Sequence, residues 1–380
     1  MPSQTIYNCD AAKPHRVDLD WLTQNPGQIF NTDTSIQDRK MMLSNIRNPN
    51  CEQNCWPAED KGSISPRLHR KGYIQSHNDC YIQPEIIDMT VNKDCNLSCS
   101  YCCKEFSSRW QRDIIDNGDY KITDSDDRYT AVDKDFVIAN ISQPDLKKNQ
   151  GYQLLLNEVK LAAPGLKKIF VSGGEPLLDN QLIETLSDMP FNPNIEFNLF
   201  SGLGLHMSRF QRLLEKLRIL SDKYANFRMK ISVESANTFY EFNRYGNTWN
   251  DFVEKINLLR DHKVSFIFHS TLSNLTLFDF ANFRRSYSDI DYTIDYAHQP
   301  RMLAPHVLDP ASKENIIEQI QNLNEKFTQN IIKSIRPDPS LKEKQNCREF
   351  LLEFTRRRPD LNLNIFPKSF LDWLEINRVV

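Results

Sequence analysis

The chain has 380 residues, of which 39% are hydrophobic and 26% are charged, and its formal net charge is −3. This composition is ordinary for a soluble globular protein, and no apolar run approaches the roughly 20 residues that a membrane-spanning helix needs. The small charge provides no field that would draw the chain onto nucleic acid, and residues 1–9 lack the pattern of a signal peptide. We therefore expect a cytoplasmic protein with no membrane or nucleic-acid partner.

The first 80 residues are irregular and rich in Asn, Pro and Asp, with one helix predicted over residues 36–46. They contain few residues for a hydrophobic core, and in segments this small a bound metal often substitutes for apolar burial. Nine cysteines in a chain without a secretory signal favour metal binding or catalysis over disulfides. Four of these cysteines lie in this segment: Cys9, Cys51, Cys55 and Cys80.

From about residue 85, short apolar runs alternate with amphipathic stretches, which is typical of a βα-repeated fold with a parallel sheet. Six strands fit a partial TIM-type barrel, so we predict an α/β fold with a partial (β/α)6 barrel over residues 81–300. The predicted strands are 86–91, 168–171, 195–200, 229–233, 265–269 and 292–296, and the predicted helices between them are 152–163, 181–187, 208–220, 249–261 and 278–285.

Two regions flank or interrupt this pattern. Residues 112–149 are polar and rich in Asp, and we predict an insertion over the first βα loop, because the carboxylate spacing favours a solvated loop over a calcium site. Residues 301–380 are predicted to form a helical extension that covers the open side or the end of the sheet. Its predicted helices span 312–329, 341–355 and 369–377, and the basic cluster of residues 356–358 is expected at a solvated helix end.

Three cysteines follow the first predicted barrel strand at a C-x3-C-x2-C spacing: Cys95, Cys99 and Cys102, with Tyr101 just before the third. Three thiolates on one loop can hold three irons of a cubane, which leaves the fourth iron without a protein ligand. A structural zinc site would need four closed ligands, and this loop does not supply them by itself. Chance clustering is the other alternative. Cys103 falls outside the spacing and is expected to be a bystander.

The triplet resembles the signature of the radical S-adenosylmethionine (SAM) superfamily, and further blocks match that family in order. The run from Ser172 to Pro176 resembles its Gly-Gly-Glu-Pro motif, whose backbone and Glu contact the SAM amino group. A tight Gly turn lets backbone carbonyls approach an ammonium closely. The resemblance thus implies SAM contacts at Gly173, Gly174, Glu175 and Pro176.

Four later residues, in three blocks, carry the resemblance further. The end of the fourth predicted strand resembles the family strand that reaches the ribose and methionine end of SAM, through Ser232 and Glu234. Arg244 resembles a family arginine that pairs with the SAM carboxylate, with a surface arginine as the alternative. Ser201 stands where many relatives carry Thr-Asn-Gly, and it is a further implied SAM contact.

The N-terminal segment resembles the twitch-type auxiliary cluster domains of some radical SAM enzymes. The block just past the triplet, residues 106–110, also resembles this group, in which the loop borders the substrate cavity. The resemblance implies a second iron–sulfur cluster held by Cys9, Cys51 and Cys55, with Cys80, Cys347 or a substrate group as the fourth ligand. The alternatives are a zinc site or unligated cysteines. The matching positions are Arg39, Met42, Leu43, Cys51, Cys55, Trp56, Glu59, Gly62, Ser65 and Arg67.

Together these resemblances imply an enzyme with a [4Fe-4S] cluster that reductively cleaves SAM. The resulting 5′-deoxyadenosyl radical abstracts hydrogen from a substrate. We favour a peptide substrate over a small metabolite, with flavodoxin or ferredoxin as the reducing partner. An electron-transfer or redox-sensing protein and a zinc-stabilised interaction protein are the alternatives from other classes. No acid–base residue is assigned, although His269, His298 and Tyr296 lie near predicted strand ends.

Overall fold

The structure, a computed structural model, describes residues 5–6, 12, 15–44, 46–52, 55–68, 80–90, 92–123, 128–129 and 149–376. None of the helices in this described part of the chain is long and apolar enough to cross a bilayer. The chain divides into two compact units. The first comprises Met1–Ile87, Ser142–Ile169 and Asp188–Ile195, and the second comprises Asp88–Ile141, Phe170–Ser187 and Glu196–Val380.

The first unit consists of short elements around a small apolar core. Glu158, on helix α7, is buried, and its carboxylate accepts hydrogen bonds from the backbone N–H groups of Gly27 at 2.8 Å and Ile29 at 3.1 Å. The N-terminal segment therefore shares its core with a helix that lies more than 100 residues further along the chain. The core comprises Ile6, Val17, Leu22 and Ile29, with Trp21, Phe30, Leu154 and Leu155 packed against it.

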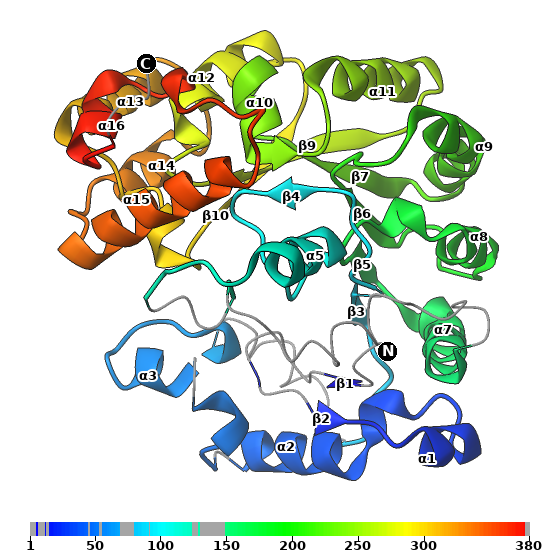
Figure 1. Cartoon of the computed structure of the whole chain (residues 1–380). Helices are drawn as coiled ribbons and strands as arrows, with labels where there is room; N and C mark the ends of the chain where they lie inside the picture. Colours follow the sequence, from blue (N-terminus) through cyan, green and yellow to red (C-terminus); the bar gives the residue numbers. More distant parts are fainter. Residues whose placement is uncertain are drawn as a thin grey trace. The chain divides into compact units, whose positions relative to one another are not determined.

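The elements of the first unit are mostly one or two turns long (Figure 1). Helix α2 (Asp33–Leu43) is capped by Thr32, whose hydroxyl accepts a hydrogen bond from the Ser35 N–H. This helix corresponds to the one predicted over residues 36–46. The other elements are β1 (Thr5–Ile6), β2 (His15–Arg16), α1 (Leu19–Gln24), η1 (Ile29–Asn31), η2 (Pro49–Cys51), α3 (Cys55–Glu59), α7 (Gln150–Ala162) and η4 (Ala163–Gly165).

A six-stranded sheet runs in the order β10-β9-β7-β6-β5-β3 (Figure 1). The β6–β7, β7–β9 and β9–β10 pairs are parallel. All six predicted strands are present, which confirms the α/β class and the partial barrel. The strands are β3 (Ile86–Thr90), β5 (Lys168–Ser172), β6 (Glu196–Ser201), β7 (Asn226–Ser232), β9 (Phe266–Leu272) and β10 (Tyr292–Tyr296).

Helices follow the strands as the periodicity predicts. In the second unit α9 packs against β7 and α11, and α10 packs against α11. The five predicted barrel helices are present within three residues at each end. Their observed bounds are α7 as given above, α8 (Asn180–Asp188), α9 (Met207–Lys223), α11 (Trp249–Asp261) and α12 (Leu277–Ser286), and the short helices η5 (Pro176–Leu178) and α10 (Asn237–Asn243) lie between them.

The C-terminal region is helical, as predicted, but the helix expected over residues 312–329 is two helices. Asn324 adopts a left-handed backbone conformation, with φ 50°, and an α-helix cannot continue through such a residue. Helix α13 contacts α12, so the extension packs beside the β10 end of the sheet (Figure 1). Its elements are η6 (Arg301–Leu303), α13 (Pro310–Gln321), α14 (Thr328–Ile335), α15 (Leu341–Arg356), η7 (Leu363–Ile365) and α16 (Lys368–Trp373).

Helix α5 (Ser108–Asn117) was not predicted from the sequence. Its first turn is capped by Ser107, whose hydroxyl accepts a hydrogen bond from the Trp110 N–H, and its end is marked by Gly118 at φ 81°. The helix occupies the first residues of the predicted polar insertion. The rest of that interval lies largely outside the described residues, apart from 118–123, 128–129 and 149.

The expectation of a solvated helix end at residues 356–358 is wrong for two of the three arginines. The side chains of Arg357 and Arg358 are 0% and 3% exposed, so residues 356–358 do not form a solvated helix end. Arg357 pairs with Asp113 of α5 at 3.2 Å, and its guanidinium lies 3.9 Å from the centre of the Tyr120 ring. Only Arg356 is exposed as expected, at 62%.

Candidate functional site

The three-cysteine loop follows β3 in the second unit and is itself partly a strand. Strand β4 (Ser98–Cys99) pairs antiparallel with β8 (Arg244–Tyr245), with Cys99 directly opposite Arg244. The Ser100 N–H donates to the Asn243 carbonyl at 2.8 Å, and the two side chains form a second hydrogen bond at 2.8 Å. The loop that carries the cysteines is thus held along one side by a second segment of the chain.

The three thiols of the loop lie close together. Cys95, Cys99 and Cys102 are near enough to influence one another's charge, and burial is the largest cause of the raised pKa of each, to about 12 for Cys95. Within the described ranges no three His, Cys, Asp or Glu side chains are placed to share a single metal ion. Thiolates that each bind a different iron of a cubane do not need to share one ion, so the three cysteines fit such a cluster.

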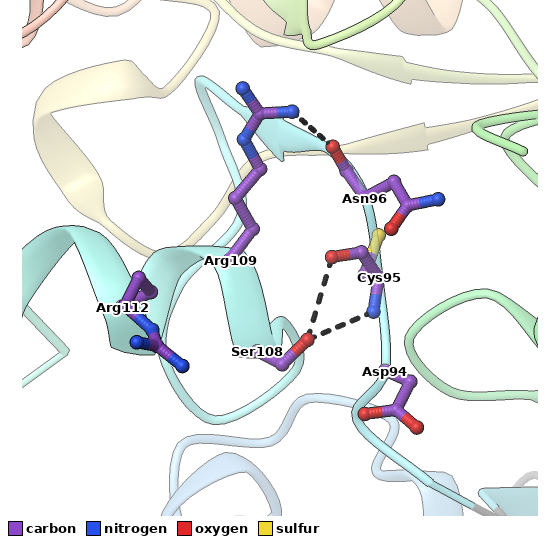
Figure 2. Close-up of a pocket in the computed structure, with 6 residues that line it drawn as sticks. All are labelled: Asp94, Cys95, Asn96, Ser108, Arg109 and Arg112. Atoms are coloured by element: carbon purple, nitrogen blue, oxygen red, sulfur yellow. Dashed lines mark hydrogen bonds between the residues drawn. The ribbon is translucent and has the colours of Figure 1, made fainter. Parts of the chain in front are cut away.

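A cavity of about 350 Å³ opens beside Cys95. Figure 2 shows its lining between the loop and the first turns of α5. The Ser108 hydroxyl accepts from the Cys95 N–H at 3.1 Å, and the Arg109 guanidinium donates to the Asn96 carbonyl while Arg112 extends away from it. Two of the six lining residues are arginines and one is an aspartate. Its lining comprises Asp94, Cys95, Asn96, Ser108, Arg109 and Arg112.

The predicted Gly-Gly-Glu-Pro turn lies against the start of the three-cysteine loop. The Gly174 N–H donates to the Asn92 carbonyl at 3.0 Å, and the Glu175 N–H donates to the Asp94 carbonyl at 2.6 Å. A Cβ atom on Gly174 would lie 2.3 Å from the Asp94 carbonyl oxygen, so only glycine permits this approach. Gly173 has φ 134°, also a conformation that side chains disfavour. The two motifs are thus joined through their backbones.

Glu175 lies at the centre of a second connection. Its carboxylate is 1% exposed and accepts hydrogen bonds from the Ser201 hydroxyl at 2.8 Å and the Gly202 N–H at 2.9 Å. Burial raises the pKa of Glu175, and these hydrogen bonds oppose that shift. Pro176 begins η5 and is buried. In this structure Glu175 therefore joins the loops after β5 and β6, and its predicted contact with the SAM amino group stays a prediction.

Sequence reasoning missed Lys255, which supports the same loop from α11. Its side chain is 0% exposed, and Nζ donates to the Leu203 carbonyl at 2.9 Å and to the Leu205 carbonyl. Nζ also forms an ion pair with Asp251 at 2.5 Å. A lysine on an otherwise amphipathic helix gives no sequence signal for this role. It anchors the backbone just past Ser201.

Glu234 and Arg244 form a buried ion pair. Arg244 Nη2 lies 2.6 Å from Glu234 Oε1, and Arg244 Nε donates to Oε2 at 3.1 Å; the two side chains are 4% and 0% exposed. The Tyr101 hydroxyl donates to Glu234 at 2.8 Å. Arg244 is thus not a surface residue, and no sequence motif indicates this pairing. Ser232 ends β7 opposite His269 in the parallel ladder.

Of the candidate acid–base residues, His269 lies on β9, Tyr296 ends β10 and His298 follows it. His269 Nδ1 lies 3.0 Å from the Thr293 hydroxyl, and burial together with Lys230 lowers the pKa of His269 to about 4. The His298 and Tyr296 rings lie next to each other, with centroids 5.9 Å apart. A neutral His269 can accept or donate a hydrogen bond at neutral pH, and it carries no charge there.

The N-terminal motif residues come together in the first unit. Cys51 and Cys55 are buried, at 7% and 2% exposed. Arg67 pairs with Glu59 and lies 4.2 Å from the centre of the Trp56 ring, and the Ser65 hydroxyl also donates to Glu59. Both thiols lie near enough to Arg67 to contribute to the raised pKa of its guanidinium, whose largest cause is the hydrogen bond to Glu59.

The candidates for the remaining ligands differ in their surroundings. The Arg39 guanidinium donates to the Cys80 carbonyl at 2.7 Å, which ties Cys80 to α2. Cys347 is 0% exposed in the second unit and accepts a hydrogen bond from Asn274 at 3.3 Å, and burial raises the pKa of its thiol to about 12. These are the surroundings of an inert core thiol. Cys9 lies outside the described residues.

Solved structures resemble the fold only distantly. The structure described as native anSMEcpe with bound AdoMet is 15% identical, with a TM-score of 0.38, and the match covers 67% of this chain and 63% of that one. SuiB of Streptococcus suis is 12% identical, with a TM-score of 0.39, over 97% of this chain and 73% of that one. The same protein bound to precursor peptide SuiA is 13% identical, with a TM-score of 0.38, over 95% and 72%. The chain thus spans less than two thirds of anSMEcpe.

No curated protein sequence matches the chain. The model of the radical SAM superfamily, however, matches residues 89–286, slightly more than half of the chain. The matched interval includes the three-cysteine loop, the Gly-Gly-Glu-Pro turn and the Glu234–Arg244 pair described above. The chain therefore belongs to the radical SAM superfamily.

Proposed function

We propose that this radical SAM enzyme reductively cleaves SAM and uses the product radical to abstract hydrogen from a substrate. The main support is a backbone contact. The N–H groups of Gly174 and Glu175 donate hydrogen bonds to carbonyls of the loop that precedes Cys95. This contact supports the proposal because the turn that would bind the amino-acid end of SAM lies next to the loop that would hold the cluster. An electron carrier has no need for such a turn, so the geometry favours SAM cleavage over simple electron transfer.

In this proposal Cys95, Cys99 and Cys102 hold three irons of a [4Fe-4S] cluster. When bound and reduced, such a cluster supplies the electron that breaks a C–S bond of SAM and releases a 5′-deoxyadenosyl radical. The protein's own part is to hold the thiolates, to exclude water and to orient SAM. The proposed SAM contacts are Gly173, Gly174, Glu175, Pro176, Ser201, Ser232, Glu234 and Arg244.

For the substrate we propose a peptide, with a small metabolite as the alternative. The support is the resemblance of residues 39–67 to auxiliary-cluster enzymes, which often modify peptides, together with the contacts that unite those residues here. A second cluster would be held by Cys51 and Cys55, with Cys9 as a third ligand and Cys80 as a candidate fourth. A cytoplasmic location and reduction by flavodoxin or ferredoxin complete the proposal.

The test is release of 5′-deoxyadenosine from the anaerobically reconstituted chain, given SAM and a strong reductant. The Cys95→Ala/Cys99→Ala/Cys102→Ala variant should release none. Cys103→Ala is the matched control, because Cys103 is adjacent and 1% exposed but lies outside the ligand spacing. Release that survives in the triple variant would refute the proposal. If iron-loaded wild type releases none, binding of radiolabelled SAM separates a requirement for substrate from an electron carrier.

A further inference from the structure

Arg244 is connected to Cys99 in two independent ways. The first is the backbone: Arg244 and Cys99 are directly opposite in the β4–β8 pair. The second is the side chain, because Arg244 Nη1 donates to Cys99 Sγ at 3.7 Å. The guanidinium therefore faces a thiol that the family assignment makes a cluster ligand.

The position of the guanidinium is held from the opposite side. Glu234 engages it through both carboxylate oxygens, at 2.6 Å and 3.1 Å, and the Tyr101 hydroxyl accepts from Nη2. Glu234 is held in turn by the Thr271 N–H at 3.2 Å. With its Nε–Nη2 edge on Glu234, the guanidinium has only its Nη1–Nη2 edge left for a ligand carboxylate. Its Nη1 is directed to the sulfur of Cys99.

A buried ion pair of this kind is weak evidence for a role in stability. The cost of removing two charges from water offsets much of their attraction, and an apolar pair of similar size is often as stable. The potential of an iron–sulfur cluster, in contrast, depends on hydrogen bonds to its sulfurs and on nearby charge. A cationic donor at a ligand sulfur stabilises the reduced, more negative cluster.

We propose that Arg244 is a positioning residue that raises the reduction potential of the cluster by donating to the Cys99 sulfur, with Glu234 holding it in place. This inference rests on the assignment of Cys95, Cys99 and Cys102 as ligands and goes beyond the proposed SAM cleavage. Glu234 also limits the effect, because its negative charge lies on the other side of the guanidinium. Removal of Arg244 and removal of the Glu234 charge should therefore shift the potential in opposite directions.

The test is an EPR-monitored redox titration, without SAM, of the full chain carrying Cys51→Ala and Cys55→Ala, so that only one cluster is titrated. In this background Arg244→Met with Glu234→Gln removes both buried charges together and leaves neither unpaired. At a fixed potential we expect its ratio of reduced to oxidised cluster to fall about tenfold, which is about 59 mV for one electron. Glu234→Gln alone should raise that ratio above the background. Arg244→Lys with Glu234→Gln, which keeps a positive charge, should have a higher ratio than Arg244→Met with Glu234→Gln.

The control is Arg260→Met, because Arg260 is 42% exposed and pairs with Asp289 on the surface. Its potential should equal that of the background. A role for Arg244 in folding alone would lower iron content and leave the potential of the loaded fraction unchanged, which would overturn the proposal. A role as a SAM ligand alone would weaken SAM binding at an unchanged potential and would overturn it equally. Absence of iron from the wild type would reject the proposed function together with this inference.

Discussion

Glu175 accepts a hydrogen bond from the Ser201 hydroxyl at 2.8 Å, and this bond joins the turn after β5 to the loop after β6. The same carboxylate also accepts from the Leu177 and Gly202 N–H groups, at 3.2 Å and 2.9 Å. Three donors thus converge on one buried carboxylate. The Glu175 backbone N–H also contacts the loop before Cys95. Glu175 therefore connects three loops of the site.

Glu175→Gln should therefore destabilise the fold and weaken SAM binding. A glutamine must direct its NH2 group toward a donor, so at least one buried N–H loses its acceptor, at a cost of about 1–3 kcal/mol. Ser201→Ala, which leaves the other two donors in place, should cost about 1 kcal/mol. Urea unfolding and equilibrium dialysis with SAM measure the two effects. Equal stability of Glu175→Gln and wild type would contradict the assigned contacts.

Gly174→Ala should separate the turn from the three-cysteine loop. The added Cβ would lie 2.3 Å from the Asp94 carbonyl oxygen and 2.5 Å from the Lys93 carbonyl carbon, and neither backbone atom can move without the loop. We expect loss of bound iron and of SAM binding. Gly165→Ala is the matched control, because its added Cβ would meet nothing within 4 Å and should change neither quantity.

Arg357→Ala should unfold the chain at a lower urea concentration, whereas Arg356→Ala should have little effect. The Arg357 side chain is 0% exposed and pairs with Glu353 and Asp113, at 2.7 Å and 3.2 Å, so its removal deprives two partly buried carboxylates of a hydrogen-bond donor, at a cost of about 1–3 kcal/mol. Arg356 contacts the same Glu353 but is 62% exposed. If the two variants unfolded at the same urea concentration, the burial of Arg357 would not explain its contribution to stability.

His269 should make the protein less stable in acid. Its pKa is about 4 in the folded chain and about 6.5 when unfolded, so between these values the unfolded chain binds more protons. Stability is complete above about pH 6.5 and falls as the pH decreases toward 4. Between pH 7 and pH 5 the loss is about 2 kcal/mol at most. Urea unfolding should show a smaller pH dependence for His269→Gln, and an unchanged dependence would contradict a neutral His269 in the folded chain.

The auxiliary cluster can be tested by iron and acid-labile sulfide content. Cys51→Ala with Cys55→Ala should remove roughly half of both, because the three-cysteine loop keeps its own cluster. Cys347→Ala should keep the full content, since that thiol is 0% exposed and bonded to Asn274 in the core. If the double variant retains as much iron as wild type, the N-terminal cysteines do not hold a cluster.

The barrel could be predicted from the sequence because its strands and helices follow simple hydrophobic periods. Strand β10 and helix α11 have the predicted bounds. Short elements are harder to predict: α5 has an apolar face through Trp110 and Ile114 but only ten residues, most of them polar, and the two-residue strands β4 and β8 form only because they meet each other. The break at Asn324 depends on one residue in a left-handed conformation, which no periodicity reveals.

The residues of the site could be named from motifs, but their contacts could not. The spacing of Cys95, Cys99 and Cys102 needs only local sequence, whereas the partners of Glu234 and Arg244 depend on how distant segments fold together. The burial of Arg357 likewise depends on Asp113, 244 residues away along the chain. Tertiary packing overrode the local expectation of a solvated helix end there.

We propose above all that the three-cysteine loop holds a cluster with one iron open to SAM. The most direct measurement is the EPR spectrum of the reduced protein with and without SAM, in the Cys51→Ala/Cys55→Ala background. We predict a [4Fe-4S] signal whose g-values and shape change when SAM is added, and which is absent in the Cys95→Ala/Cys99→Ala/Cys102→Ala variant. A cluster signal that SAM leaves unchanged, or one that survives loss of the three cysteines, would contradict the claim.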